Sequence, residues 1–126
     1  SSDQVVLLDG EPVSKPRDHA GAVDQLTRSS GRTLTFSTAL YLYNSASKQG
    51  QGIIEPYHVT FRSLTGDEIE RYLRSEQPYD CAGSFKSEGL GITLIERMQG
   101  DDPNSLIGLP LIRLRAMLAK EGVQLP

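Results

Sequence analysis

Three short clusters of polar residues have types and spacings that could support chemistry. The first is Ser2-Asp3-Gln4, directly before an apolar run. A carboxylate at the mouth of a buried strand can hold a divalent cation or accept a proton from water. The second is Ser14-Lys15-Pro16, where a lysine held by the following proline could contact a phosphate as a point charge. Judged by spacing alone, the first cluster is more often a solvated carboxylate than a catalytic one. The second is more often an exposed lysine in a turn than a phosphate contact.

The third cluster is the glycine-punctuated segment from Cys81 to Gly91. Its three glycines would let the backbone approach a ligand closely. Lys86 could meet a phosphate, and Glu88 could accept hydrogen bonds from the edge of a base. The alternative is a loop that needs glycine only for its backbone angles.

Several other catalytic and nucleotide-binding motifs do not occur in the chain. It has no G-x-x-x-x-G-K-[ST] loop, no G-x-G-x-x-G after a strand, no H-E-x-x-H, no cysteine pair for zinc and no G-x-S-x-G elbow. His19 and His58 are isolated, which favours surface or hydrogen-bonding roles for both.

The elements expected to position these clusters alternate between strands and helices. Alternation predicts long strands over 32–43 and 53–62, joined by a polar loop over 44–52, with Pro56 at an edge or bulge. Thr65 and Glu68 form a capping box for a helix that ends near residue 78. Asp18 is expected to cap a second helix over 18–30, which Gly31 would end. The remaining expectations are a strand buried on both faces over 5–8, a turn at 9–10, a short return strand over 11–13, a strand over 92–95, an acidic turn over 100–105 and a final helix carrying Leu111, Leu114, Met117 and Leu118.

This pattern predicts one α/β or α+β domain over residues 1–126 with a mixed sheet. The 126 residues suffice for one core but not two, and 37% hydrophobic and 23% charged residues are typical of globular chains. A net charge of −3 argues against a broad nucleic-acid surface, and no apolar run could span a bilayer. The single cysteine, Cys81, fits a reducing cytoplasm.

Taken together, the clusters resemble the Maf family of nucleoside triphosphate pyrophosphatases. That family has an S/A-D-x-V strand, a G/S-K-P loop, an A-G-x-[FY]-x-x-[QE]-G segment and an acidic G-D-x-x-N-x-x-G-L-P turn. The corresponding segments here follow in the same order and at roughly the same spacing along the whole chain: Ser2 to Val5, Ser14 to Pro16, Ala82 to Gly89, and Gly100 to Pro110, which has one residue more before Gly108 than the family turn.

The resemblance implies an inosine-triphosphatase-like α/β fold, with an elongated mixed sheet and flanking helices. It implies hydrolysis between the α and β phosphates of a nucleoside triphosphate, assisted by Mg²⁺ or Mn²⁺. Asp3 would accept the proton and bind the metal, and Lys15 would offset phosphate charge. Gln4 and Glu88 would select the base, with Lys86 as a further substrate-binding candidate. A homodimer is the expected assembly.

The substrate expected from the resemblance is 7-methyl-GTP. Gln4 and the string from Cys81 to Gly89 are similar to the branch of the family that acts on it. A carboxylate at position 88 suits the N1–H and N2 donors of guanine and would repel the carbonyl edge of thymine or uracil. A dTTP/UTP pyrophosphatase of the same family is the alternative.

The sequence departs from the family pattern at its start. Family members begin with a strand and an S-x-S-x-R-R-type loop that grips the phosphates, and a further acidic residue usually helps to bind metal. Neither occurs here, so we expect an N-terminally truncated, C-terminal part of the domain. A third alternative is therefore an inactive folded fragment with residual nucleotide binding.

Overall fold

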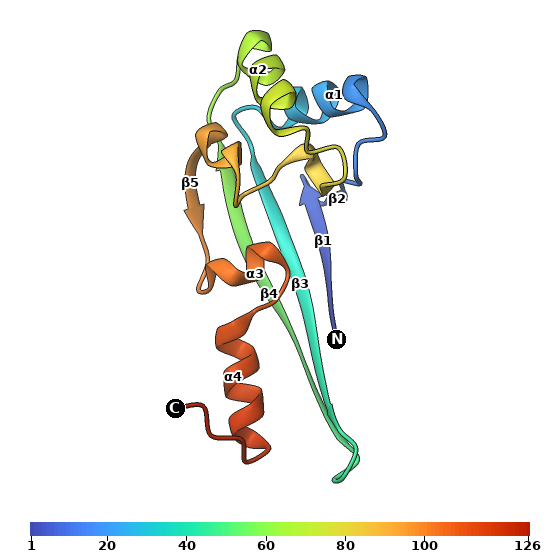
Figure 1. The fold of residues 1–126 in the computed structure, drawn as a ribbon, viewed down its shortest axis with the longest axis vertical. Helices are drawn as coiled ribbons and strands as arrows, with labels where there is room; N and C mark the ends of the chain where they lie inside the picture. Colours follow the sequence, from blue (N-terminus) through green and yellow to red (C-terminus); the bar gives the residue numbers. More distant parts are fainter.

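The computed structural model describes all 126 residues, from Ser1 to Pro126. It contains one five-stranded sheet with helices packed against it (Figure 1). The strand order is β2 (Glu11–Pro12), β1 (Ser2–Leu8), β3 (Thr33–Asn44), β4 (Gln49–Phe61) and β5 (Ile95–Gln99). The expected α/β class with an elongated sheet and flanking helices is confirmed. Every strand pair is antiparallel, however, so the expected parallel component is not among these five strands.

Strand β1 is longer than the apolar run that predicted it and is buried on one face only. Val6 and Leu8 are buried, whereas Val5 is 46% exposed. The prediction of a strand buried on both faces was wrong, because the core packs against a single face of the sheet. The Asp9-Gly10 turn and the short return strand β2 are confirmed.

Strands β3 and β4 form a long hairpin that extends well beyond the rest of the sheet (Figure 1). Pairing continues to Asn44 and Gln49, so the loop expected over 44–52 is a much shorter turn in which Lys48 has a φ of +60°. Strand β5 pairs with β4 only from His58 onwards, which leaves Pro56 on a free edge, as predicted.

Two capped helices cover one end of the sheet. In α1 (His19–Ser29), the Asp18 side chain accepts from the Gly21 amide, and Gly31 ends the segment with a φ of +69°. In α2 (Gly66–Glu76), Thr65 and Glu68 form the predicted capping box. The hydrogen bond from the Thr65 amide, followed by that from Arg62, lowers the pKa of Glu68 to about 2.

The C-terminal third departs furthest from expectation. Residues 92–95 were predicted to be a strand, but Leu90–Leu94 is a 3₁₀ segment and β5 begins at Ile95. The acidic turn over 100–105 was also wrong in part, because Asp102 caps a short helix, α3 (Pro103–Ile107). The predicted final helix is α4 (Leu111–Lys120), with Pro110 just outside its first turn.

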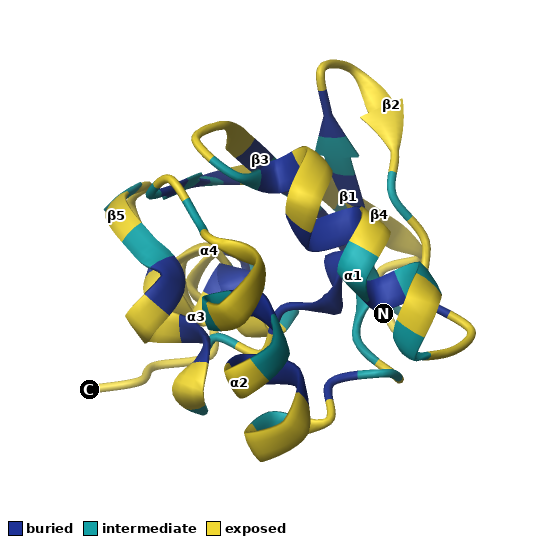
Figure 2. Ribbon diagram, turned by 90° about the horizontal axis from the view of Figure 1, so that it is seen from above, coloured by how far each residue is buried: buried dark blue, intermediate teal, exposed yellow.

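The core lies between the covered face of the sheet and helices α1 and α2. Fifteen buried residues form one cluster that includes Leu26, Phe61 and Leu73. Figure 2 shows this burial in α1 and the adjoining strands, while β2 and the C-terminal tail are exposed. None of the helices has the length and apolar character needed to cross a membrane.

Candidate active site

A row of three polar side chains crosses the covered face of the sheet. Gln4 on β1 pairs in register with Thr38 on β3, and Thr38 pairs with Glu55 on β4. Thr38 is fully buried and Glu55 is 3% exposed. Polar groups in such a position need hydrogen-bond partners, and segments far along the chain supply them.

The Gln4 amide is the first of these connections. Its Nε2 donates to Thr38 Oγ1 at 3.0 Å, to the Ser105 carbonyl at 3.0 Å and to the Leu106 carbonyl at 3.2 Å. Thr38 Oγ1 also donates to the Ser105 carbonyl, at 3.0 Å. Gln4 therefore anchors α3 to the sheet, a role that the sequence did not suggest.

Charged groups complete the attachment of the C-terminal helices. Arg113 Nε donates to Glu55 Oε2 at 2.8 Å, and this bond raises the pKa of Arg113. Asp102 accepts from the amides of Asn104 and Ile112, each at 2.8 Å, and so joins α3 to α4. Burial alone would raise the pKa of Asp102, but these amide donors lower it overall.

Between α3 and the Cys81–Gly91 segment lies a cavity of about 170 Å³. Gln4 and Glu88, the two residues predicted to select a base, both line it. Their positions are 84 apart in the sequence, and the fold brings them together. The other lining residues are mainly apolar: Phe36, Cys81, Ala82, Phe85, Ser87, Leu106 and Ile107. Apolar side chains with a few convergent polar groups, here Gln4 and Glu88, are the usual lining of a small-molecule site.

The Cys81–Gly91 segment is held by helix α2. The Lys86 amide donates to the Tyr72 hydroxyl at 3.0 Å, and the Leu90 amide donates to Glu76 Oε1 at 2.6 Å. Burial is the main cause of the raised pKa of Tyr72. A Cβ at Gly91 would lie 2.3 Å from the Lys86 carbonyl oxygen, so this tight turn requires glycine. Lys86 and Glu88 are exposed side chains on a backbone that is fixed at both ends.

The Lys15 loop lies beside the start of the same segment. The Ser14 carbonyl accepts from the Gly83 amide at 3.2 Å and from Gln25 Nε2 at 2.8 Å. The Val13 amide donates to the Val6 carbonyl at 2.7 Å, which places the loop along the outer edge of β1. Lys15 itself is exposed.

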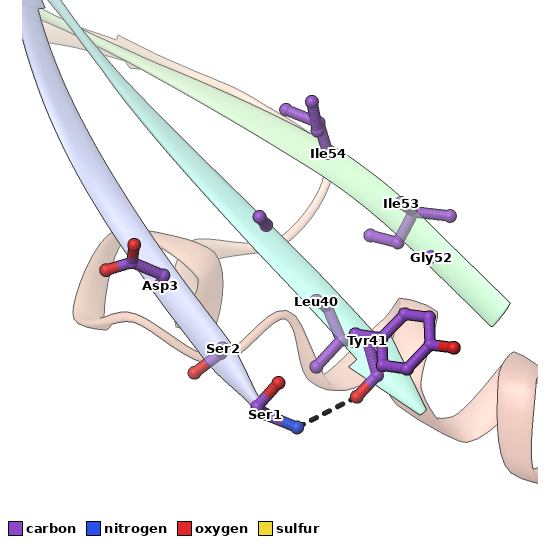
Figure 3. A pocket seen from close by; sticks show the side chains of 9 residues that line it. Ser1, Ser2, Asp3, Leu40, Tyr41, Gly52, Ile53 and Ile54 are labelled. Atoms are coloured by element: carbon purple, nitrogen blue, oxygen red, sulfur yellow. Dashed lines mark hydrogen bonds between the residues drawn. The ribbon is translucent and has the colours of Figure 1, made fainter. Parts of the chain in front are cut away.

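Asp3 lies on the opposite face of β1 from Gln4, because successive strand residues point to opposite faces. It pairs with Ala39, which pairs with Ile54, on the uncovered face. There it is the single acidic side chain in an open hollow of about 650 Å³ (Figure 3). Asp3 is exposed, and its Oδ1 accepts from the Gln4 amide at 3.0 Å. Asp3 therefore does not share the cavity lined by Gln4 and Glu88.

The residues around Asp3 fit a divalent cation only in part. No group of three or more histidine, cysteine, aspartate or glutamate side chains is placed to hold a metal ion. One carboxylate is nevertheless the kind of protein contribution that Mg²⁺ sites often use, since Mg²⁺ retains waters and takes further oxygens from substrate phosphates.

Comparison with known proteins decides the family. The family model for "Maf-like protein" matches residues 1–121. The chain belongs to the Maf family. This agrees with the order of the clusters along the sequence, and it places Asp3, Lys15 and the Cys81–Gly91 segment within the matched region.

Several curated relatives are named 7-methyl-GTP pyrophosphatase. The relative from Methylobacillus flagellatus is 57% identical over 121 residues, covering 96% of this chain and 63% of its own length. Those from Nitrosococcus oceani and Vibrio cholerae are 51% and 52% identical, covering 96% and 97% of this chain and 61% and 63% of their own lengths. The chain thus spans a little under two thirds of the relatives it matches.

Several structurally important residues were not anticipated from the sequence. Thr38, Glu55 and Arg113 gave no local signal, because their partners are distant in sequence. Asp102 did carry one, since Asp before Pro is a common start of a helix. The histidines were anticipated correctly: His58 Nδ1 lies 3.0 Å from Thr35 Oγ1, and His19 bonds to Tyr79 and Glu70.

Proposed function

We propose that this Maf protein hydrolyses the bond between the α and β phosphates of 7-methyl-GTP. The products would be the nucleoside monophosphate and pyrophosphate. The observation that carries the proposal is the cavity lined by both Gln4 and Glu88, in a chain whose relatives bear that substrate in their names. A carboxylate matches the N1–H and N2 donors of guanine, and 7-methylation adds positive charge to the ring.

The arrangement supports a nucleotide bound around the outer edge of β1. Strand β2 pairs only with Leu7 and Leu8, so residues 2–5 have no strand beside them on that side. The base would occupy the cavity beside Gln4. The triphosphate would pass along the free edge, within reach of the Lys15 loop, to Asp3 on the other face.

In this proposal, Asp3 accepts a proton from the water that attacks the α-phosphorus. A new bond forms from the water oxygen to phosphorus, the α–β bridging bond breaks, and pyrophosphate leaves. Lys15 and Lys86 offset the charge on the phosphates. Asp3 would also contribute one ligand to a Mg²⁺ or Mn²⁺ ion, which when bound polarises the phosphate oxygens. A homodimer in the cytoplasm belongs to the same proposal.

The deciding experiment offers the full-length gene product equal concentrations of 7-methyl-GTP, GTP, dTTP and UTP with Mg²⁺ or Mn²⁺. The Methylobacillus flagellatus relative serves as the positive control. We expect pyrophosphate release with the highest kcat/KM for 7-methyl-GTP. Preference for dTTP or UTP would overturn the substrate assignment. No turnover of any nucleotide, with the control active, would overturn the proposed hydrolysis itself.

A further inference from the structure

Gln25 is a buried polar residue on α1 that is bonded to both segments carrying the proposed substrate contacts. It is 8% exposed and does not line the base cavity. Its Nε2 donates to the Ser14 carbonyl at 2.8 Å, next to Lys15. Its Oε1 accepts from Ser84 Oγ at 2.6 Å, four residues before Glu88.

A third bond closes this arrangement. The Gly83 amide donates to the same Ser14 carbonyl at 3.2 Å. Gln25 therefore spans a junction at which the Lys15 loop and the Ala82–Ser84 turn meet directly. Ser84 is fully buried, and its φ of +58° is unusual for a residue other than glycine. Residues in such angles persist where surrounding contacts hold them.

We infer that Gln25 is a positioning residue that sets the distance between Lys15 and Glu88. This inference rests on the proposed function, in which Lys15 contacts the phosphates and Glu88 the base. Both side chains are exposed on loops, so their separation depends on what fixes the backbone beneath them. The two bonds of one buried amide fix both loops to the same point of α1.

An amide is suited to this position because one partner is an acceptor and the other a donor. Nε2 satisfies the Ser14 carbonyl and Oε1 satisfies the Ser84 hydroxyl. Glutamate could keep the bond from Ser84 but could not donate to Ser14. Leucine would remove both bonds at similar volume. Comparison of the glutamate and leucine variants therefore separates the effect of losing the bond to Ser14 from the effect of losing both bonds.

The test measures steady-state kinetics on 7-methyl-GTP for the full-length gene product with Gln25→Leu, Gln25→Glu and Ser84→Ala. Misplacement of about 1 Å can cost on the order of 10²-fold, so we expect kcat/KM to fall about 10- to 100-fold in Gln25→Leu. Ser29→Ala is the matched control: Ser29 is also buried on α1, but its hydroxyl bonds only to the Gln25 backbone carbonyl.

Coupling to Lys15 distinguishes positioning from a general loss of stability. If Gln25 acts through Lys15, Gln25→Leu should have little further effect in a Lys15→Ala background. Undiminished losses in that background, or equal losses in Ser29→Ala, would overturn the inference. If Gln25→Leu does not fold, Ser84→Ala replaces it. Its effect on kcat/KM is then measured in the parent protein and in the Lys15→Ala variant, which gives an equivalent double-mutant cycle.

Hydrogen exchange separates this inference from the proposed function. The Gly83 amide should lose protection in Gln25→Leu but keep it in Ser29→Ala, whatever the protein hydrolyses. Unchanged protection would show that Gln25 does not hold the junction. If the parent protein were inactive while Gln25→Leu still lost protection at Gly83, Gln25 would hold the junction but the proposed function would be contradicted. The role of the junction in substrate binding would then be contradicted as well.

Discussion

Gln4 Nε2 lies 3.0 Å from the Ser105 carbonyl, although the two residues are 101 positions apart in the sequence. The bond joins the first strand to helix α3 across the covered face of the sheet. The same residue lines the proposed base cavity. Gln4 thus has a structural role as well as its proposed role in base selection, and the two must be separated by experiment.

Substitution of Gln4 should reduce stability. Gln4→Leu leaves the Leu106 carbonyl without its bond from Nε2, and the loss of a buried partner typically costs about 1 to 3 kcal/mol. Gln4→Glu should be at least as destabilising, because a carboxylate cannot donate to the two carbonyls. Urea unfolding measures both. Gln99→Glu, at an exposed position on β5, is the control; equal losses there would show that the contacts to α3 do not matter.

Asp3→Asn should leave folding intact and remove most hydrolysis. Asp3 is exposed and bonds only to the neighbouring amide, so its contribution to stability is small. Loss of a general base typically costs about 10²- to 10⁴-fold in rate. Turnover of 7-methyl-GTP and thermal unfolding are measured on the same samples.

The control for that experiment is Asp9→Asn, just beyond the same strand. Asp9 has a φ of +52°, which asparagine also tolerates, and its ion pair with Arg32 is exposed. We expect near-normal turnover in this variant. Comparable activity of Asp3→Asn and the parent protein would remove Asp3 from the mechanism.

Glu88→Gln should weaken the preference for 7-methyl-GTP over dTTP and UTP. The amide keeps the shape of the side chain but replaces one acceptor with a donor facing the base. Glu88 is exposed in the free protein, but a bound base would cover it, and a mismatched hydrogen bond that is buried costs about 1 to 3 kcal/mol. Each 1.4 kcal/mol is about tenfold in the ratio of kcat/KM. Lys86→Gln is the control: it removes a charge from the same loop, and we expect it to leave the preference for 7-methyl-GTP over dTTP and UTP unchanged. An unchanged ratio for Glu88→Gln would place base selection elsewhere.

Asp102 should contribute stability that is lost in acid. Its folded-state pKa lies below the usual value, so the contribution is complete above the unfolded-state pKa of about 4 and is lost as pH falls through the lower folded pKa. Asp102→Asn should therefore be less stable than the parent at pH 7, with a smaller difference near pH 3. Urea midpoints across this range provide the measurement. A difference that grows towards low pH would contradict the assignment.

Local features of the sequence predicted local structure well. Asp18 and the Thr65–Glu68 capping box marked helix starts, because a cap bonds to amides only two or three residues away. Alternation located β3 and β4 because one face of each is buried. The prediction of a strand over 92–95 was wrong, because this short apolar run has no period that separates a strand from a 3₁₀ turn.

The candidate site was only partly predictable, because it depends on contacts between segments that are distant in the sequence. Cluster types pointed to Asp3, Gln4, Lys15, Lys86 and Glu88, but spacing could not show which of them share a cavity. Asp3 and Gln4 are neighbours on one strand, so their side chains point to opposite faces of the sheet, which follows once β1 is known to begin at Ser2. The partners of Gln4 and Gln25 depend on how distant segments pack, which no local pattern encodes.

The long β3–β4 hairpin has a consequence for the order of folding. All twelve residues of β3 pair with β4 across a short turn, so these contacts close small loops. The Gln4–Ser105 bond closes a loop of about a hundred residues, which costs more chain entropy. We expect φ-values to be high at Val59 in the hairpin and near zero at Gln4. The surfaces that meet around the base cavity would then be the last to assemble on a nascent chain.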